Sequence, residues 1–160
     1  MLPGMSVEVT PRGSRGVAMP RLPGPIMRFM NDTMFRIFRN RPFNGTPLLA
    51  LTTVGARSGQ ERRSTVACFQ ESDNSWLIVA SAGGAATHPA WFFNLARNPD
   101  RVLAQIGNRH VKVTPETLKG EERASAWQRI TTQAPSFGTY LQKTDREIPI
   151  VRLRAQTSIG

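Results

Sequence analysis

Length, composition and charge exclude several classes of protein. The chain has 160 residues, a mass of 17.7 kDa and 39% hydrophobic residues, which is enough for one domain with its own core. With one cysteine, Cys68, and two histidines, His88 and His110, we expect no disulfide, no metal site and a reducing, cytoplasmic compartment. There are 21 basic residues, 18 of them arginine, against 11 acidic residues. The resulting net charge of +10 predicts an anionic partner such as a phosphate, a carboxylate, nucleic acid or anionic lipid.

The N-terminal part of the sequence predicts a tail followed by a helix. The opening residues lack the pattern of a signal peptide, and no apolar run approaches the roughly 18 residues of a membrane span. Residues 1–25 carry five prolines and four glycines, so we predict a flexible tail there and a single domain over 26–160. From Ile26 to Asn40 the apolar residues gather on one third of a helical circumference, with arginines opposite. This amphipathic helix packs across a barrel or sheet, rests on a membrane surface, or does both.

The remainder predicts a small barrel with flanking helices. Short β-type runs occur at Leu48–Val54, Ser64–Gln70, Ser75–Ser81, Arg101–Ile106, His110–Thr114 and Ile148–Leu153. Helical stretches occur at Pro89–Arg97, where Thr87 or His88 would form the N-cap, at Pro115–Gln133 and at Ser136–Lys143. Short connections favour hairpins. We therefore predict an α+β fold, a six-stranded and mostly antiparallel split β-barrel, in preference to a doubly wound parallel sheet.

The turn at 54–63 is the first candidate for chemistry. Gly55 and Gly59 leave backbone N–H groups accessible, and Arg57, Arg62 and Arg63 flank them, as an anion cradle requires. The turn has neither a P-loop ending nor a dinucleotide fingerprint. A solvated hairpin loop is the alternative interpretation.

The loop at 81–91 is the second candidate. Gly83 and Gly84 free the backbone, and Pro89 suits the start of a helix whose N-terminal N–H groups would accept a phosphate or the carbonyl edge of a planar ring. An ordinary connection is the alternative. Trp91 either stacks on a ligand or packs in the core, and Asn94 one turn later either contacts the ligand or faces water.

The stretch at 137–143 is the third candidate. Tyr140, the only tyrosine, could donate a proton or a hydrogen bond to a substrate oxygen, or it could simply pack. The acidic residues form no evident catalytic pair, and no serine or cysteine triad is suggested. If the protein is an enzyme, a cofactor must bring the chemistry.

Together these segments resemble the deazaflavin-dependent nitroreductase family, split β-barrel proteins that bind coenzyme F420. The matching pieces are Leu48–Arg63, Val79–Gly84 with His88–Leu95, and Tyr140 with Lys143–Val151, in that order and over most of the predicted domain. The resemblance implies an oxidoreductase that transfers a hydride from reduced F420 to a quinone, a nitro compound or an activated alkene.

The resemblance also implies which residues form the site. The turn would hold the phosphate and acidic tail of the coenzyme, and the loop would line the ring with N–H groups near its pyrimidine edge, where negative charge sits after reduction. Ala82 stands where relatives often carry lysine, so one electrostatic contact to the coenzyme is either absent or supplied by Lys143. Ser81 and Tyr140 are the implied catalytic hydrogen-bond donors. The implied cofactor-binding residues are Gly55, Arg57, Ser58, Gly59, Arg62, Ser81, Ala82, Gly83, Gly84, Pro89, Trp91, Asn94 and Lys143.

Three alternatives remain at this point. The same barrel and cradle could hold flavin mononucleotide (FMN), or the protein could store a deazaflavin without turnover. A non-catalytic basic protein for nucleic acid or lipid is the third, although the aromatic residues are not interleaved with the arginines as a nucleic-acid platform needs, so we expect no nucleic-acid partner. We expect a monomer or homodimer, and an apolar quinone would agree with the 26–40 helix lying on the inner face of the cell membrane.

Overall fold

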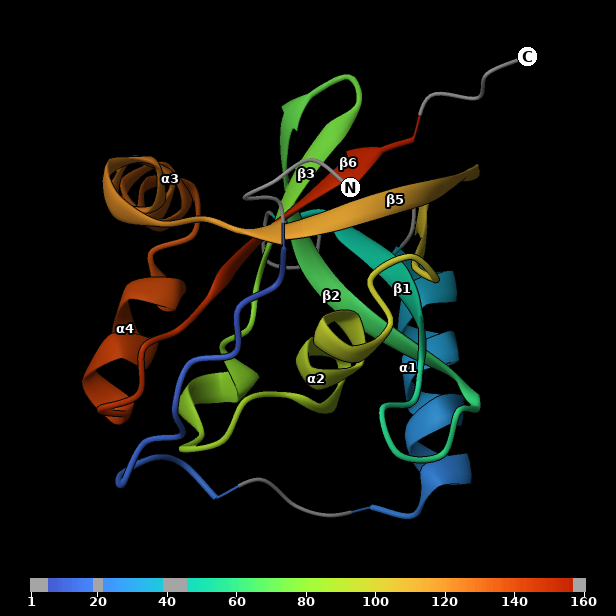
Figure 1. The fold of residues 1–160 in the computed structure, drawn as a ribbon, viewed down its shortest axis with the longest axis horizontal. Helices are drawn as coiled ribbons and strands as arrows, with labels where there is room; N and C mark the ends of the chain where they lie inside the picture. The colour runs from blue at the N-terminus through green and yellow to red at the C-terminus, as the bar shows by residue number, and fades with distance from the viewer. Residues whose placement is uncertain (1–5, 19–21, 39–45, 157–160) are drawn as a thin grey trace.

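The fold is a closed six-stranded barrel with helices on opposite sides (Figure 1). The computed structural model describes residues 6–18, 22–38 and 46–156. The strands are β1 (Leu48–Val54), β2 (Glu61–Ser72), β3 (Ser75–Val79), β4 (Leu103–Ile106), β5 (Arg109–Thr117) and β6 (Ile150–Ala155). They follow one another around the barrel in the order β1-β2-β3-β6-β5-β4, and every pair is antiparallel. The predicted α+β split barrel is confirmed.

Alternating side chains of the strands supply two cores. Leu51, Ile78 and Leu153 point into the barrel, where Phe92 and Leu95 of helix α2 (Ala90–Arg97) join them and close one end. The alternate residues point outward and pack under α3 (Gly120–Gln133) and α4 (Ser136–Lys143). This second core consists of Phe69, Leu77, Val79, Leu118, Ala126, Ile130, Ala134, Ile148 and Ile150.

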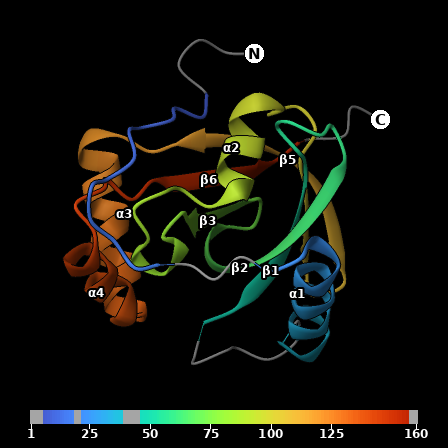
Figure 2. The ribbon, with the colours of Figure 1, turned by 90° about the horizontal axis from the view of Figure 1, so that it is seen from below.

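Helix α1 (Gly24–Phe38) lies on the side of the barrel away from α3 and α4 (Figure 2). It docks on β2 through its polar side, because Thr65 donates hydrogen bonds to Asn31 from its backbone N–H (3.2 Å) and its hydroxyl (2.8 Å), and Asp32 pairs with Arg63 at 3.4 Å. Phe35 is its buried residue. The apolar residues Ile26, Met30 and Ile37 are instead 48%, 49% and 58% exposed.

Helix α1 thus packs on the barrel, as one interpretation of the sequence has it, but not through the apolar face that the sequence pattern marked. The hydrophobic pattern marked a real face, but hydrogen bonds to the β2 backbone and one buried ring determine which side docks. The last two residues of the predicted helix, 39 and 40, lie outside the described residues.

Residues 6–18, predicted as part of a flexible tail, run as an extended strap across the barrel domain (Figure 1). Thr117 donates its backbone N–H to Ser6 O at 3.1 Å, and Gly13 and Val17 donate theirs to the carbonyls of Ala86 (2.8 Å) and Gly84 (3.0 Å). The prediction missed these contacts because proline and glycine prevent a helix but not an extended segment that is hydrogen-bonded to distant residues. The rest of the predicted tail includes residues 1–5 and 19–21, which are outside the described part.

Most predicted elements agree with the structure apart from their ends. The run at 48–54 and the helix at 136–143 have the predicted bounds, whereas the helix predicted from Pro115 begins only at Gly120. Pro115 continues β5 instead and lies opposite Leu153 of β6. None of the helices in the described ranges is long and apolar enough to cross a bilayer.

Candidate functional site

The turn between β1 and β2 forms a compact loop that leaves its charged side chains exposed. Gly55 donates its N–H to Gln60 O at 2.7 Å, and Gly59, at φ +69°, donates to Gly55 O at 2.9 Å. A Cβ on Gly55 would lie 2.5 Å from Ser58 Oγ, so a side chain there would displace the Ser58 hydroxyl from its hydrogen bond to Gln60 N. Arg57, Ser58 and Arg62 are exposed on this frame. The two guanidinium groups can bind a phosphate or carboxylate, and the Ser58 hydroxyl, which accepts the N–H of Gln60 at 3.1 Å, can still donate to one.

Asn94 connects this turn to helix α2. Its buried side-chain Oδ1 accepts the backbone N–H of Ala56 at 2.9 Å, and its Nδ2 donates to Thr53 Oγ1 at 3.1 Å. Trp91 is 7% exposed and belongs to the barrel core, with its ring edge-on to Phe92. Both side chains are therefore engaged with the protein itself. Core packing, the alternative interpretation for Trp91, agrees with this placement, and contact of either residue with a cofactor stays a prediction.

The loop after β3 contains a turn of three residues with positive φ. Ala82, Gly83 and Gly84 have φ values of 46°, 64° and 88°. Ser81 precedes this short 3-10 turn and Gly84 returns its N–H to Ser81 O at 2.8 Å. Left-handed conformation is costly for alanine, so the surrounding structure must hold Ala82 in place.

Helix α4 brings the third candidate segment against this turn. A Cβ on Gly84 would lie 2.8 Å from Lys143 Cβ and 3.5 Å from Tyr140 O, so only glycine permits the observed approach. Tyr140 is half-buried, packs edge-on against Phe137 at 5.3 Å, and has Lys143 Nζ 5.6 Å from its ring centre. The structure thus brings together Ser81, the left-handed turn, Tyr140 and Lys143.

Two further residues of this region have roles that the sequence did not predict: Arg146, and His88, which was expected at the start of a helix. The guanidinium of Arg146, a residue 3% exposed, donates to the carbonyls of Ala80, Ser81 and Ala85 and to His88 Nδ1. His88 is 5% exposed and donates from Nε2 to Thr10 O at 2.6 Å. Burial lowers the pKa of both side chains, and the neighbouring Arg146 lowers that of His88 further.

His88 therefore does not cap helix α2, which starts after Pro89 without any side-chain cap. Pro89 is the last residue before the helix, and its carbonyl accepts the N–H of Phe92 at 3.0 Å. A basic residue between Asp145 and Glu147 resembles a surface position in the sequence, so nothing in the sequence signalled the burial of Arg146.

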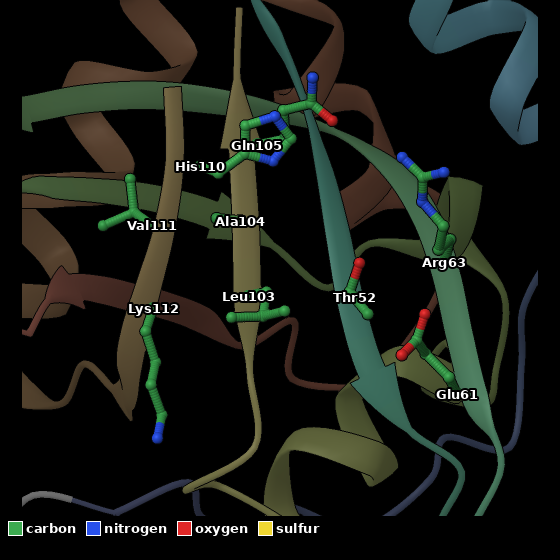
Figure 3. Close-up of a pocket in the computed structure, with 9 residues that line it drawn as sticks. All are labelled: Thr52, Glu61, Arg63, Leu103, Ala104, Gln105, His110, Val111 and Lys112. Atoms are coloured by element: carbon green, nitrogen blue, oxygen red, sulfur yellow. The ribbon is translucent and has the colours of Figure 1, made fainter. Parts of the chain in front are cut away.

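A hollow of about 410 Å³ lies elsewhere, on the outer face of β1, β2, β4 and β5 (Figure 3). Leu103 at 49% exposure faces it, together with Thr52, Glu61, Arg63, Gln105, His110 and Lys112. Arg63, which flanks the first candidate turn, lines this hollow, whereas none of the implied cofactor-binding residues does. In the described ranges of the chain, no three histidine, cysteine or acidic side chains gather as a metal site.

Comparisons with known proteins address the family directly. Residues 29–155 match the family model described as F420H(2)-dependent quinone reductase. An F420H(2)-dependent quinone reductase of Mycobacterium tuberculosis is 33% identical over 141 residues, which cover 86% of this chain and 91% of the relative. The putative F420H(2)-dependent quinone reductase of Mycobacterium bovis matches equally well.

Solved structures agree with this result. An F420-H2-dependent reductase superimposes with a TM-score of 0.61 at 36% identity, covering 68% of this chain and 94% of that one. A domain-swapped dimer also has a TM-score of 0.61, at 32% identity, and covers 79% and 97% of the two chains. On the extent of these matches, the chain belongs to the F420H(2)-dependent quinone reductase family.

Proposed function

We propose that this protein is an oxidoreductase that transfers a hydride from reduced coenzyme F420 to an electron-poor small molecule, a quinone first of all. One structural observation supports this most strongly: the β1–β2 turn, helix α2, the left-handed turn and helix α4 lie along one side of the barrel (Figure 1). These are the segments that carry the family resemblance. The family match favours F420 as the cofactor and gives no support to FMN.

The residues present suit the chemistry of this cofactor. The exposed Arg57 and Arg62 with Ser58 offer charge and hydrogen bonds to phosphate and carboxylate groups. Gly83 has no side chain to cover the backbone of the left-handed turn, as the edge of a planar ring requires, and Gly84 permits the close approach of helix α4. We assign the tail to the first group and the ring to the second.

When bound, reduced F420 supplies the hydride and its electron pair. The protein's part is then to bind, orient and exclude water, because the described residues around the turn and helix α4 include no catalytic acid–base pair. Tyr140 and Ser81 are the candidate hydrogen-bond donors to a substrate oxygen. Lys143, beside both Gly84 and the Tyr140 ring, adds positive charge where the reduced ring carries negative charge.

A binding titration of the purified protein tests this function. Oxidised F420 and, separately, FMN are added while ring fluorescence is followed, and the titration is repeated at raised salt. We expect F420 to bind at least tenfold more tightly than FMN, and reduced F420 to be oxidised on addition of a soluble quinone. Binding of FMN alone would contradict the proposal, and binding without quinone turnover would leave the storage alternative. Nitro compounds and activated alkenes are the next substrates to assay.

Contact with a membrane is a finer proposal that rests on helix α1. Its outward face has six exposed apolar residues, and Arg28 and Arg36 are exposed on the same helix. A basic helix of this kind suits the surface of an anionic bilayer, the phase in which apolar quinones dissolve. We therefore place the protein in the cytoplasm with α1 against the inner face of the membrane. The exposed apolar residues are Ile26, Met27, Phe29, Met30, Met34 and Ile37.

Sedimentation with phosphatidylglycerol vesicles tests this contact. Ile37→Asp should reduce vesicle binding roughly tenfold, since removal of one large apolar side chain from the bilayer costs about 1.5–3 kcal/mol. The melting temperature should not change, because Ile37 is 58% exposed. Leu141→Asp, on the exposed side of α4, is the matched control. If Ile37→Asp instead dissociates a dimer of the free protein, a second copy covers α1 and the membrane proposal fails.

A further inference from the structure

Arg146 is a buried arginine whose partners are peptide carbonyls. Its Nε donates to Ala85 O at 3.0 Å, Nη1 to Ala80 O at 3.1 Å and Nη2 to Ser81 O at 2.9 Å. Nη1 also donates to His88 Nδ1 at 2.7 Å. The planar fork thus has a partner at each of its three nitrogens, an arrangement that lysine cannot reproduce.

No carboxylate of the described residues pairs with this guanidinium, although acidic residues flank it in the sequence. Asp145 accepts from the backbone N–H groups of Ser14 and Arg15 (2.9 Å each), and Glu147 lies 3.7 Å from Arg123. Burial of an unpaired charge is unfavourable, as the lowered pKa of Arg146 reflects. The hydrogen bonds to the loop carbonyls must therefore compensate for that cost.

The three carbonyls bracket the left-handed turn. Ala80 and Ser81 lie immediately before Ala82, and Ala85 follows Gly84, so Arg146 ties the entrance of the turn to its exit. Ala82 has a Cβ and a φ of 46°, a conformation that alanine leaves unless it is held. The guanidinium holds it from one side, opposite to the direction in which the following N–H groups point.

The orientation of the peptide groups determines which backbone N–H of the turn faces the site. In a trans peptide the C=O and the following N–H point in opposite directions. Because Ser81 O points at Arg146, the N–H of Ala82 points away from it. The N–H groups of Gly84 and Ala85 donate within the turn, to Ser81 O and Ala82 O, and Ala86 N lies against Gly16 of the strap. We propose that Arg146 is a positioning residue, which acts by holding the left-handed turn so that the backbone N–H of Ala82 faces the edge of the bound deazaflavin. This inference rests on the proposed function and adds a residue to its site.

The first experiment measures F420 affinity and local exchange together. Arg146→Met in the full chain should weaken binding of oxidised F420 at least tenfold. It should also accelerate amide exchange at residues 82–86 in the cofactor-free protein. Arg123→Met is the matched control, because Arg123 also donates to a backbone carbonyl, Ile148 O at 2.7 Å, but does not touch the loop. The control should change affinity less than threefold.

The second experiment removes the strain that Arg146 is inferred to counter. Glycine has no preference against φ of 46°, so Ala82→Gly should restore affinity about fivefold in the Arg146→Met background and change it less than threefold in the wild type. A purely structural role would give no such rescue, because the substitution would not repair a general loss of stability.

Arg146→Lys separates position from charge and also serves if the methionine variant does not fold. We expect lysine to fail, with affinity and exchange at 82–86 as in Arg146→Met, because a single ammonium cannot bracket the turn. Full recovery by lysine, or unchanged exchange at 82–86, would overturn the inference. Absence of F420 binding by the wild type would instead refute the proposed function, while the exchange data would still report on the turn itself.

Discussion

Two groups of arginines in this molecule have opposite environments and opposite roles. Arg57 and Arg62 are exposed on a two-glycine turn. Arg146 and Arg152 are buried, the first among carbonyls and the second among carboxylates. The exposed pair can bind a ligand because the protein does not use their charges, whereas the buried pair stabilises the protein because its charges are used. Net charge alone therefore says little about where an anionic partner binds.

The largest expected effect is on stability and comes from the buried group. Arg152 donates to Glu71 at 2.6 and 2.8 Å and to Glu116 at 3.0 Å. Arg152→Met removes the nearest cation from both carboxylates and leaves Arg129 at 3.7 Å from Glu71 and Arg154 at 3.4 Å from Glu116. We expect the free energy of unfolding to fall by roughly 3 kcal/mol. Urea unfolding measures it. Arg154→Met, at a position with a 49% exposed side chain, is the control and should lose under about 1 kcal/mol. Equal decreases in the free energy of unfolding of the two variants would show that the buried arginine contributes no more to stability than the exposed one.

The strap over the loop predicts the next effect. A Cβ on Gly16 would lie 2.2 Å from Ala86 N and 2.6 Å from Ala85 C, both backbone atoms that cannot move aside cheaply. Gly16→Val should therefore detach the strap, with a loss of about 1–3 kcal/mol as for other overpacked positions. Gly24→Ala has open space around its Cβ and should be neutral. Thermal melting of both variants checks this. An unchanged melting temperature of Gly16→Val would show that the strap does not pack against the backbone of Ala85 and Ala86.

The exposed group should show the reverse behaviour. Arg57→Ala is expected to weaken F420 binding about tenfold or more, since a hydrogen bond to a charged group contributes about 1.5–3 kcal/mol. The free energy of unfolding of this variant should change by less than about 0.5 kcal/mol. Arg97→Ala, an exposed arginine at the end of α2, is the control. Unchanged affinity in Arg57→Ala would move the anion site away from the turn.

The smallest effect is a dependence on pH. The hydrogen bonds from Arg152 hold the pKa of Glu71 below its ordinary value of 4.5. Its contribution is complete above about pH 4.5 and is lost as pH falls through the lower pKa of the folded state. His88 acts in the same direction from about pH 6.5 downward, because burial disfavours its charged form. The free energy of unfolding, measured from pH 7 to 3, should fall by at most about 1.4 kcal/mol per pH unit for each proton taken up. In Glu71→Gln this decrease should be smaller below about pH 4.5.

Sequence reasoning succeeded where one local pattern determined the outcome. The strand at 48–54 was predicted with its true ends because apolar β-type residues run up to a glycine turn. The three candidate segments were found because glycine, proline and arginine have local meanings. It failed where distant residues decided: the docked side of α1 depends on Thr65, the continuation of β5 through Pro115 depends on β6, and the burial of Arg146 depends on Ala80 and Ala85.

The strap also bears on the order in which the molecule assembles during translation. Ser14 and Arg15 contact Asp145, and the residue separation between Ser14 and Asp145 is 131. Contacts at such separation form slowly because a long loop must close first. The segment that leaves the ribosome early therefore waits for partners synthesised more than a hundred residues later. A nascent chain stalled before Asp145 should keep this segment open to proteases, and release of the complete chain should protect it.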